Sequence, residues 1–210
     1  MPVMKLYEAV RSSASFRVRI ALNLKSLPYE SIALDLRKGA HRAEDYARVN
    51  PQQAVPALVD GHRTLLQSMA ILEYLDETYP APPLLPSAPF DRARVRAISQ
   101  LISCDIHPLD NLRVLAWLEH QLRLDQSSID WWYHHWIHEG FVALERILGE
   151  PATGSFCQGD APTMADCCLV PQVVNALRFK VDLGRYPRIV RIHEACMKID
   201  AFAKAHPDHQ

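Results

Sequence analysis

The stretch RSSASFRVRIAL, residues 11–22, is the most informative part of the chain, because it places two serines and an arginine where a short strand gives way to a helix. Residues 4–7 look like a brief strand, and from Ala14 onward apolar positions recur at helical spacing. Ser12 or Ser13 therefore lies near a helix start, where unpaired N–H groups and the helix dipole attract anions. An ordinary N-cap serine gives the same pattern, so these residues leave a purely structural role open.

Composition places the chain among globular proteins. Its 210 residues are 49% hydrophobic and 22% charged, enough to bury a substantial core in one or two domains. The net charge of −1 provides no basic field for nucleic acid. The first residues lack the features of a signal peptide, and no segment stays apolar for the ~18 residues that a membrane span needs. We therefore expect a cytoplasmic protein that binds neither nucleic acid nor membranes.

The cysteines and a histidine-rich segment do not indicate a disulfide or a metal site. The five cysteines are odd in number and contain no C-x-x-C pair, so we expect buried, reduced thiols. His134 and His138 have a spacing that metals use on a helix, but no third ligand accompanies them. We predict no metal there, with the neighbouring tryptophans packed into the core or the substrate pocket and these histidines facing water.

Residues 1–82 are predicted to form a small α+β domain. Its elements follow the order βαβαββα, with strands near 6–7, 30–34, 56–59 and 63–66 and helices near 14–26, 41–48 and 68–79. Gly61 marks a hairpin turn between the last two strands. Pro56 begins the third strand, and the sequence alone favours a trans peptide bond before it.

A proline-rich connector separates this domain from the rest of the chain. Residues 79–89 contain five prolines, which cannot continue a helix, and we place the linker at 83–89. Long amphipathic runs then follow at 90–121, 128–148, 163–179 and 187–204. Residues 90–210 are therefore predicted to form an all-helical domain. Pro108 should bend the first of its helices and re-aim the side chains nearby.

Several motifs, in this order along the chain, resemble the glutathione transferase superfamily. They are the serines at the first strand–helix junction, Val55-Pro56, Gln67-Ser68 and residues 159–166. The last of these resembles the capping box of the superfamily's helical domain, with Thr163 capping and Asp166 reaching back. The resemblance implies the glutathione transferase fold, a thioredoxin-like domain followed by an all-α helical bundle.

Within that superfamily the chain resembles the zeta class, the maleylacetoacetate isomerases, and their bacterial relatives, the maleylpyruvate isomerases. The resemblance covers nearly the whole chain and is carried by residues 11–13, 17–22, 50–51, 55–56, 67–68, 169–173 and 178–183. The zeta motif Ser-Ser-Cys is here Ser12-Ser13-Ala14. The missing cysteine bears on side activities such as dehalogenation more than on isomerisation, because the nucleophile in isomerisation is the sulfur of glutathione.

The resemblance implies glutathione as cosubstrate, a small dicarboxylate as substrate and a homodimer. The expected reaction belongs to aromatic-ring catabolism: the thiolate would add to the cis double bond of maleylacetoacetate, the resulting single bond would rotate, and elimination of the thiolate would release the trans isomer. A thiol is mostly protonated near pH 7, so a hydroxyl donor and a helix N-terminus must favour its thiolate. The substrate carboxylates need cations, which arginines supply best.

The resemblance also implies roles for particular residues. Catalysis is expected of Ser12, Ser13, Arg11 and Arg178. Glutathione contacts are expected of Ser12, Gln53, Val55, Pro56, Gln67, Ser68, His107 and Asn111, with a cis peptide bond before Pro56 and the γ-glutamyl carboxylate at Gln67-Ser68. Substrate contacts are expected of Arg11, Arg113 and Arg178, although the spacing of Arg113 equally suits a solvated helix residue.

Three alternative functions remain open. His107 and Asn111 resemble the maleylpyruvate isomerases, since the zeta class commonly has glutamine at the first position, and this favours maleylpyruvate of the gentisate pathway as substrate. A transferase that conjugates or dehalogenates small electrophiles would share the thiolate site without requiring several arginines. A glutathione-binding scaffold would lack the activating hydroxyls that Ser12 and Ser13 provide.

Overall fold

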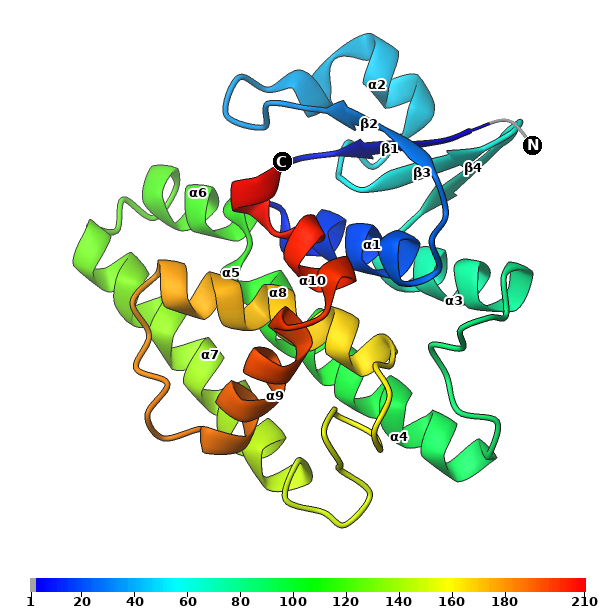
Figure 1. The fold of residues 1–210 in the computed structure, drawn as a ribbon. Coiled ribbons are helices and arrows are strands. Elements are labelled where there is room, and N and C mark those ends of the chain that lie inside the picture. The colour runs from blue at the N-terminus through cyan, green and yellow to red at the C-terminus, as the bar shows by residue number, and fades with distance from the viewer. Residues whose placement is uncertain (1–2) are drawn as a thin grey trace. The chain divides into compact units, whose positions relative to one another are not determined.

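A computed structural model describes residues 3–210, which divide into two compact units (Figure 1). The first unit contains the chain up to Leu84 together with Met197–Gln210, and the second contains Leu85–Cys196. The sequence suggests a helical domain over 90–210, whereas its last residues belong to the first unit. The reason is that α10 (Asp200–Ala205) packs against α1 (Ser13–Leu24).

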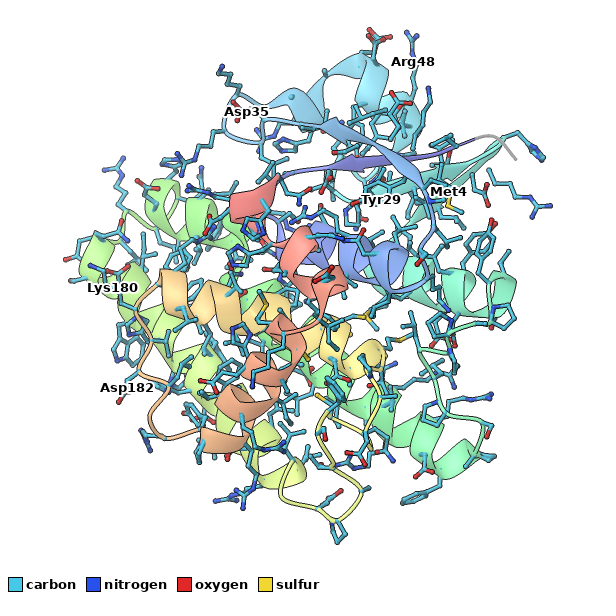
Figure 2. The ribbon with its side chains drawn as sticks, viewed as in Figure 1. Met4, Tyr29, Asp35, Arg48, Lys180 and Asp182 are labelled. Carbon is cyan, nitrogen blue, oxygen red and sulfur yellow. The ribbon has the colours of Figure 1, made fainter. Side chains whose placement is uncertain are left out.

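The first unit is built on a four-stranded sheet with the order β2-β1-β3-β4. The strands are β1 (Met4–Glu8), β2 (Tyr29–Ala33), β3 (Ala57–Asp60) and β4 (Arg63–Leu66). β1 is parallel to β2 and antiparallel to β3, and Figure 2 labels Met4 and Tyr29, the first residue pair of the parallel register. Gly61 turns the predicted hairpin between β3 and β4 with a φ of +60°, which glycine adopts without steric cost.

Helices cover both faces of this sheet. α1 and α3 (Ser68–Thr78) pack together on one face, and α2 (Glu44–Val49) lies on the other after the short 3₁₀ turn η1 (Ala40–Arg42) (Figure 1). The core between sheet and helices includes Leu6, Ile20 and Leu58, none of which is exposed. The element order βαβαββα and the thioredoxin-like arrangement are therefore confirmed.

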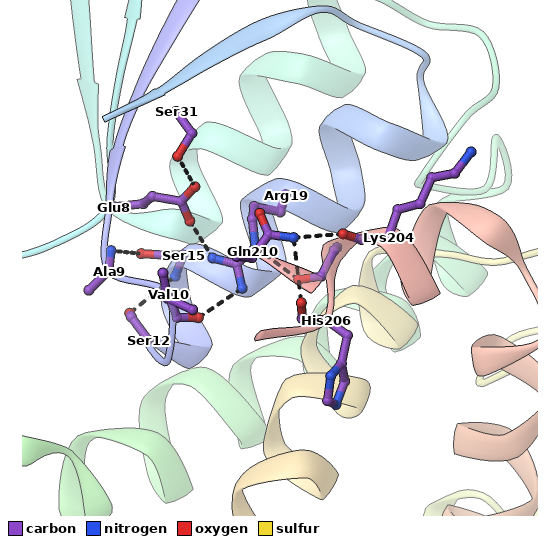
Figure 3. A network of polar contacts seen from close by, with 11 residues as sticks. Glu8, Ala9, Val10, Ser12, Ser15, Arg19, Ser31, Lys204, His206 and Gln210 are labelled. Carbon is purple, nitrogen blue, oxygen red and sulfur yellow. Dashed lines mark hydrogen bonds and ion pairs between the residues drawn. The ribbon is translucent and has the colours of Figure 1, made fainter. Parts of the chain in front are cut away.

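A buried polar network ties α10 and the turn after β1 to α1 (Figure 3). Arg19 pairs with Glu8, and it donates to the carbonyl oxygens of Ala205 at 2.9 Å and Val10 at 3.0 Å. Glu8 also accepts a hydrogen bond from Ser31 at 2.7 Å. Arg19 and Glu8 are both buried, so removing either would leave an uncompensated charge. The network therefore holds in place the turn that leads to Ser12.

The second unit is built from helices. They are α4 (Pro89–Gln100), the π-helical segment η2 (Leu101–Ile106), α5 (His107–Asp110), α6 (Leu112–His120), α7 (Gln126–Ile147), α8 (Met164–Arg178) and α9 (Pro187–Met197). The all-helical expectation for this region is confirmed. The chain ends with α10 and the 3₁₀ turn η3 (Pro207–His209), in the first unit.

The first helical run is interrupted where the sequence predicts a bend. Pro108 has no N–H to donate, and at Asn111 the backbone becomes extended (φ −79°, ψ 158°) before α6 begins. The π segment packs closely on α7, because a Cβ added at Gly140 would lie 2.3 Å from the side chain of Ile106. The predicted bend is therefore a full break, preceded by one π-helical turn.

α8 begins with the predicted capping box. The backbone N–H of Thr163 donates to Oδ2 of Asp166 at 2.7 Å, and the N–H of Cys157 donates to Oδ1 at 2.9 Å. Asp166 is completely buried, and this burial raises the pKa of its carboxyl group against the opposing effect of these hydrogen bonds. The start of α8 is thus neutralised from within the chain.

The cysteines are mostly where the sequence predicts. All five are free thiols, and Cys157, Cys167, Cys168 and Cys196 are buried. Cys104 is exposed, because it lies on the outer side of the π segment rather than in the core.

None of the helices in residues 3–210 is long and apolar enough to cross a membrane.

Candidate functional site

Ser12 is the N-cap of α1. Its backbone is extended (φ −76°, ψ 120°), and its Oγ accepts the N–H of Ser15 at 3.2 Å. Because the oxygen is the acceptor in this bond, the hydroxyl proton can be donated to a ligand. Ser12 is half-buried, whereas Ser13 is only 5% exposed. The capping role and the functional role predicted for Ser12 are therefore compatible, and Ser12 is more accessible than Ser13.

The start of α1 carries no acidic residue in its first turn. The helix dipole and the first amides are therefore not neutralised by a neighbouring carboxylate. Arg11 is exposed just before the cap, and no carboxylate in residues 3–210 is paired with it. This end of α1 suits a bound anion such as a thiolate.

The loop before β3 contains three of the predicted glutathione contacts. Gln53 is exposed with a φ of 54°, Val55 is half-buried and Pro56 is buried. The peptide bond between Val55 and Pro56 is cis, as the resemblance implies, so the expectation of a trans bond from general frequency is wrong. The loop is held by Asn50, whose Nδ2 donates to the carbonyl oxygen of Ala54 at 2.6 Å.

The start of α3 contains two more of the predicted glutathione contacts, Gln67 and Ser68. Gln67 is the N-cap with a φ of 67°, and its Nε2 donates to Oε1 of Gln52 at 2.7 Å. Ser68 is the first helical residue, and it is 6% exposed. Its Oγ accepts a hydrogen bond from Nη1 of Arg17 at 3.2 Å. No acidic residue lies in the first turn of α3, so its amides are available to an anion.

The donors of the first unit fit glutathione. A hydroxyl and unneutralised amides at the start of α1 suit a thiolate, and a similar set at the start of α3 suits a carboxylate. A carboxylate accepts several hydrogen bonds at once, which this donor set can supply. Gln52 and Arg17, which contact Gln67 and Ser68, were not predicted, since nothing local in the sequence distinguishes them.

In the second unit, His107 and Asn111 bracket the short helix α5. His107 follows the π segment and is half-buried. Asn111 is the N-cap of α6: its Oδ1 accepts the N–H groups of Arg113 at 3.0 Å and Val114 at 3.2 Å, and its Nδ2 donates to the carbonyl oxygen of Pro108 at 3.1 Å. Asn111 therefore has a capping role in addition to the predicted glutathione contact, with one amide proton left for a ligand.

Arg113 lies on the exposed face of α6. No carboxylate in the described residues is paired with its guanidinium group. This exposure is compatible with both of the roles left open for Arg113.

Arg178 is exposed at the C-terminal end of α8, and α7 supports the residue that follows it. The guanidinium carbon of Arg178 lies 4.9 Å from the ring centre of Phe179. The ring of Phe179 stacks on Tyr133 with a centroid distance of 3.8 Å, and its carbonyl oxygen is hydrogen-bonded to Nε2 of His134 at 2.8 Å. Burial raises the pKa of the Tyr133 phenol, which therefore stays neutral.

The connection after α8 carries Lys180 and Asp182, both labelled in Figure 2, and ends at Tyr186. His138 contacts Tyr186 through a hydrogen bond of 2.7 Å between Nδ1 and the phenol oxygen. The prediction that His134 and His138 face water is therefore wrong, because each is bonded to this connection. Trp131 in turn is 69% exposed, so of the two places predicted for the tryptophans it does not lie in the core.

The described residues, 3–210, contain no group of three or more His, Cys, Asp or Glu side chains placed to hold a metal ion.

The predicted residues thus form two sets. The first unit holds Arg11, Ser12, Ser13, Gln53, Val55, Pro56, Gln67 and Ser68, and the second holds His107, Asn111, Arg113 and Arg178. Within the first unit, the contact between Arg17 and Ser68 connects α1 directly with α3. Within the second, the contacts of Tyr133 and His134 with Phe179 place α7 against the end of α8.

Comparison with known proteins finds relatives along the whole chain. Residues 2–77 match the family described as glutathione S-transferase, N-terminal domain. A maleylacetoacetate isomerase from Rhizobium meliloti (strain 1021) is 52% identical over 204 residues, which cover 97% of this chain and 95% of that protein.

Solved structures match as closely. The holo structure of a maleylpyruvate isomerase, described as a bacterial glutathione S-transferase of the zeta class, has a TM-score of 0.97 and 48% identity, with 98% of each chain covered. A maleylacetoacetate isomerase from Methylobacterium extorquens AM1, solved with bound malonate and GSH, has a TM-score of 0.96 and 45% identity, covering 98% of this chain and 97% of that one.

Proposed function

Because the chain belongs to the glutathione transferase family, within its zeta class, we propose that it isomerises maleylacetoacetate to fumarylacetoacetate with glutathione as cosubstrate. When bound, glutathione supplies a thiolate that adds reversibly to the cis double bond and so allows rotation about it. The observation that carries the proposal lies at the start of α1. There the hydroxyl of Ser12 can donate its proton to a ligand, and the first turn of the helix contains no acidic residue. The chain that carries this feature matches isomerases over nearly its whole length.

Ser12 keeps the thiol ionised. A free thiol has a pKa near 8.5, so most of it is protonated at neutral pH. The hydroxyl of Ser12 donates a hydrogen bond to the sulfur, and the unneutralised start of α1 adds its dipole, so that both favour the thiolate. Ser13 supports this turn from its buried position.

Further residues hold glutathione itself. Gln67 and Ser68, at the start of α3, bind its γ-glutamyl carboxylate through a side-chain amide, a hydroxyl and helix amides. The remaining contacts assigned by the resemblance are those of Gln53, Val55, Pro56, His107 and Asn111.

Arginines bind the two carboxylates of the substrate. A guanidinium group presents paired N–H donors in a fixed plane, which matches a carboxylate better than an ammonium group does. Arg11, Arg113 and Arg178 are all exposed, so a ligand can reach them. The related isomerase from Methylobacterium extorquens was solved with malonate, a small dicarboxylate, together with GSH. These residues therefore select doubly acidic olefins.

Maleylpyruvate is the second candidate substrate. The histidine and asparagine at positions 107 and 111 resemble the maleylpyruvate isomerases, and the solved zeta-class enzyme of that name is 48% identical to this chain. Both substrates present two carboxylates and a cis double bond, so the same mechanism serves either one.

A spectrophotometric assay tests the proposal. Maleylacetoacetate and maleylpyruvate are supplied side by side, each with and without glutathione. We expect isomerisation only when glutathione is present. The diacid that is isomerised faster is then assigned as the natural substrate. Glutathione binding without isomerisation of either diacid would instead support the scaffold alternative, and activity confined to uncharged electrophiles would support a conjugating transferase.

We also propose that the protein acts as a homodimer in the cytoplasm, as the resemblance implies. Sedimentation equilibrium over a range of concentrations tests the first statement, and fractionation of the source cells tests the second.

A further inference from the structure

The structure describes four buried cations, Arg17, Arg19, Lys25 and Arg94, each 9% exposed or less. Three of them are paired with a carboxylate and with carbonyl oxygens. Nζ of Lys25, for example, contacts Asp76 at 2.9 Å and the carbonyl oxygens of Tyr79 at 2.7 Å and Pro82 at 2.8 Å. Arg19 and Arg94 have comparable sets. Burial of a cation in this fold is thus normally accompanied by compensation from within the chain.

Arg17 is the exception. It is 2% exposed, and its one hydrogen bond runs from Nη1 to Oγ of Ser68. Nε and Nη2 are buried and have no hydrogen-bond partner within residues 3–210, where no carboxylate is paired with this side chain either. A guanidinium group does not lose its charge in a protein, and an unpaired buried charge is strongly unfavourable. The missing negative charge must therefore come from outside the chain.

The neighbouring hydroxyl shows where that charge belongs. A serine hydroxyl has one proton, and in the bond with Arg17 its oxygen is the acceptor, so the proton of Ser68 is directed to another group. Ser68 is the first residue of α3, an 11-residue helix whose first turn has neither an acidic residue nor a side-chain cap. The cation, the hydroxyl and the helix amides are three independent attractions for a single anion.

We propose that Arg17 is a positioning residue for the γ-glutamyl carboxylate of glutathione, an inference that rests on the proposed function. Arg17 fixes the hydroxyl of Ser68 with its proton directed to the carboxylate, and it supplies the positive charge that this carboxylate balances. Arg17 acts through Ser68 rather than by contact with the reacting atoms. Binding of glutathione therefore compensates a charge that the folded chain alone leaves unbalanced.

Calorimetric titration with two ligands tests this inference. One ligand is glutathione, and the other is its analogue in which the α-carboxylate of the γ-glutamyl residue is a carboxamide. Arg17→Met is expected to raise the Kd of glutathione about 10–100-fold, as expected for loss of a charged hydrogen bond, and to leave the Kd of the carboxamide within about twofold. The inference is overturned if Arg17→Met weakens the binding of both ligands equally, or if it weakens the binding of neither.

Thermal unfolding without ligand separates positioning from a merely structural role. An apolar side chain often replaces an unpaired buried charge without loss of stability, so we expect Arg17→Met to keep or raise the Tm of the free protein. The matched control is Lys25→Met, which removes a fully paired buried cation. It should lower the Tm and leave the Kd of glutathione unchanged. A lower Tm with an unchanged Kd for Arg17→Met would overturn the inference.

Arg17→Lys is the second variant, and it tests the charge itself. It keeps a cation and a donor, so the Kd of glutathione should stay within a few-fold of the wild-type value. A Kd as high as that of Arg17→Met would contradict the assignment. If the wild-type protein does not bind glutathione, the proposed function itself fails. If the wild-type protein binds glutathione and Arg17→Met binds it with the same Kd, this inference alone is overturned.

Discussion

The helices α1 and α8 begin in similar ways and use their first turns differently. Each starts with a hydroxyl residue, Ser12 or Thr163, in extended conformation. Three residues later α8 has Asp166, a buried carboxylate that accepts hydrogen bonds from within the chain, whereas α1 has Ser15. The positive end of α8 is therefore closed, and the positive end of α1 remains open to a ligand.

A hydroxyl at a helix start therefore does not by itself indicate function. The residue at the third helical position decides whether the first amides and the dipole are neutralised internally. α3 follows the pattern of α1, since it has no acidic residue in its first turn and carries Ser68 there. The resemblance assigns glutathione to the N-termini of α1 and α3, and neither of these helices has an acidic residue in its first turn.

The largest effect is expected from opening the closed terminus. Asp166→Ala should lower the free energy of unfolding by about 3–5 kcal/mol, because the N–H groups of Thr163 and Cys157 lose a buried carboxylate acceptor. Urea denaturation measures this change. The control is Asp160→Ala in the same loop, where an exposed carboxylate accepts from Ser155 and a far smaller loss is expected. Similar losses in the two variants would remove the contrast between the helices.

At the open terminus, Ser12→Ala should affect catalysis more than stability. We expect turnover to fall about 100-fold, because the glutathione thiolate loses one hydrogen-bond donor. The loss of stability should be only about 1 kcal/mol, which is the usual contribution of an N-cap. Affinity for glutathione should change only a few-fold, and the pKa of the bound thiol should rise. Steady-state kinetics and an absorbance titration of the thiolate measure these quantities. Ser13→Ala, at a position that is only 5% exposed, should lower turnover less. Unaltered turnover in Ser12→Ala would transfer the activating role to another residue.

The far end of α8 provides the third prediction. Arg178→Ala should raise the KM for the diacid by about 2–3 kcal/mol, or roughly 30–150-fold, because a charged hydrogen bond to a carboxylate is lost. Arg185→Ala, which removes an exposed cation from the same connection, should leave the KM nearly unchanged. An equal effect of Arg178→Ala on an uncharged electrophile would argue against carboxylate binding.

The smallest effect concerns His138, which supports the connection after α8 through its hydrogen bond with Tyr186. Burial and the nearby charge of Arg185 and His134, partly offset by Asp182, lower the pKa of His138 below its ordinary value of 6.5. The unfolded chain therefore binds this proton more readily, so the contribution of His138 to stability is complete above about pH 6.5 and is lost as the pH falls through the lowered pKa. Urea midpoints between pH 7 and pH 5 should decline more in the wild-type protein than in His138→Gln. Parallel declines would contradict this role.

Much of the architecture follows from local patterns. The periodicity of residues 14–22, the Gly61 turn and the prolines of residues 79–89 predict the element order and the change from α+β to all-helical structure, and each is a property of neighbouring residues. The capping box at Thr163 and Asp166 was predictable for the same reason, because its two members lie within one helical turn.

The order of the elements, the family and the positions that the resemblance assigns to glutathione and substrate can therefore all be predicted from the amino-acid sequence. Which buried charges are compensated depends on how the folded chain packs. Arg17 meets Ser68 across 51 residues, and Arg19 meets Ala205 across 186. Such contacts have no local period, because they depend on how the sheet and helices pack rather than on neighbours along the chain. For the same reason, the uncompensated charge of Arg17 becomes visible only in the folded molecule.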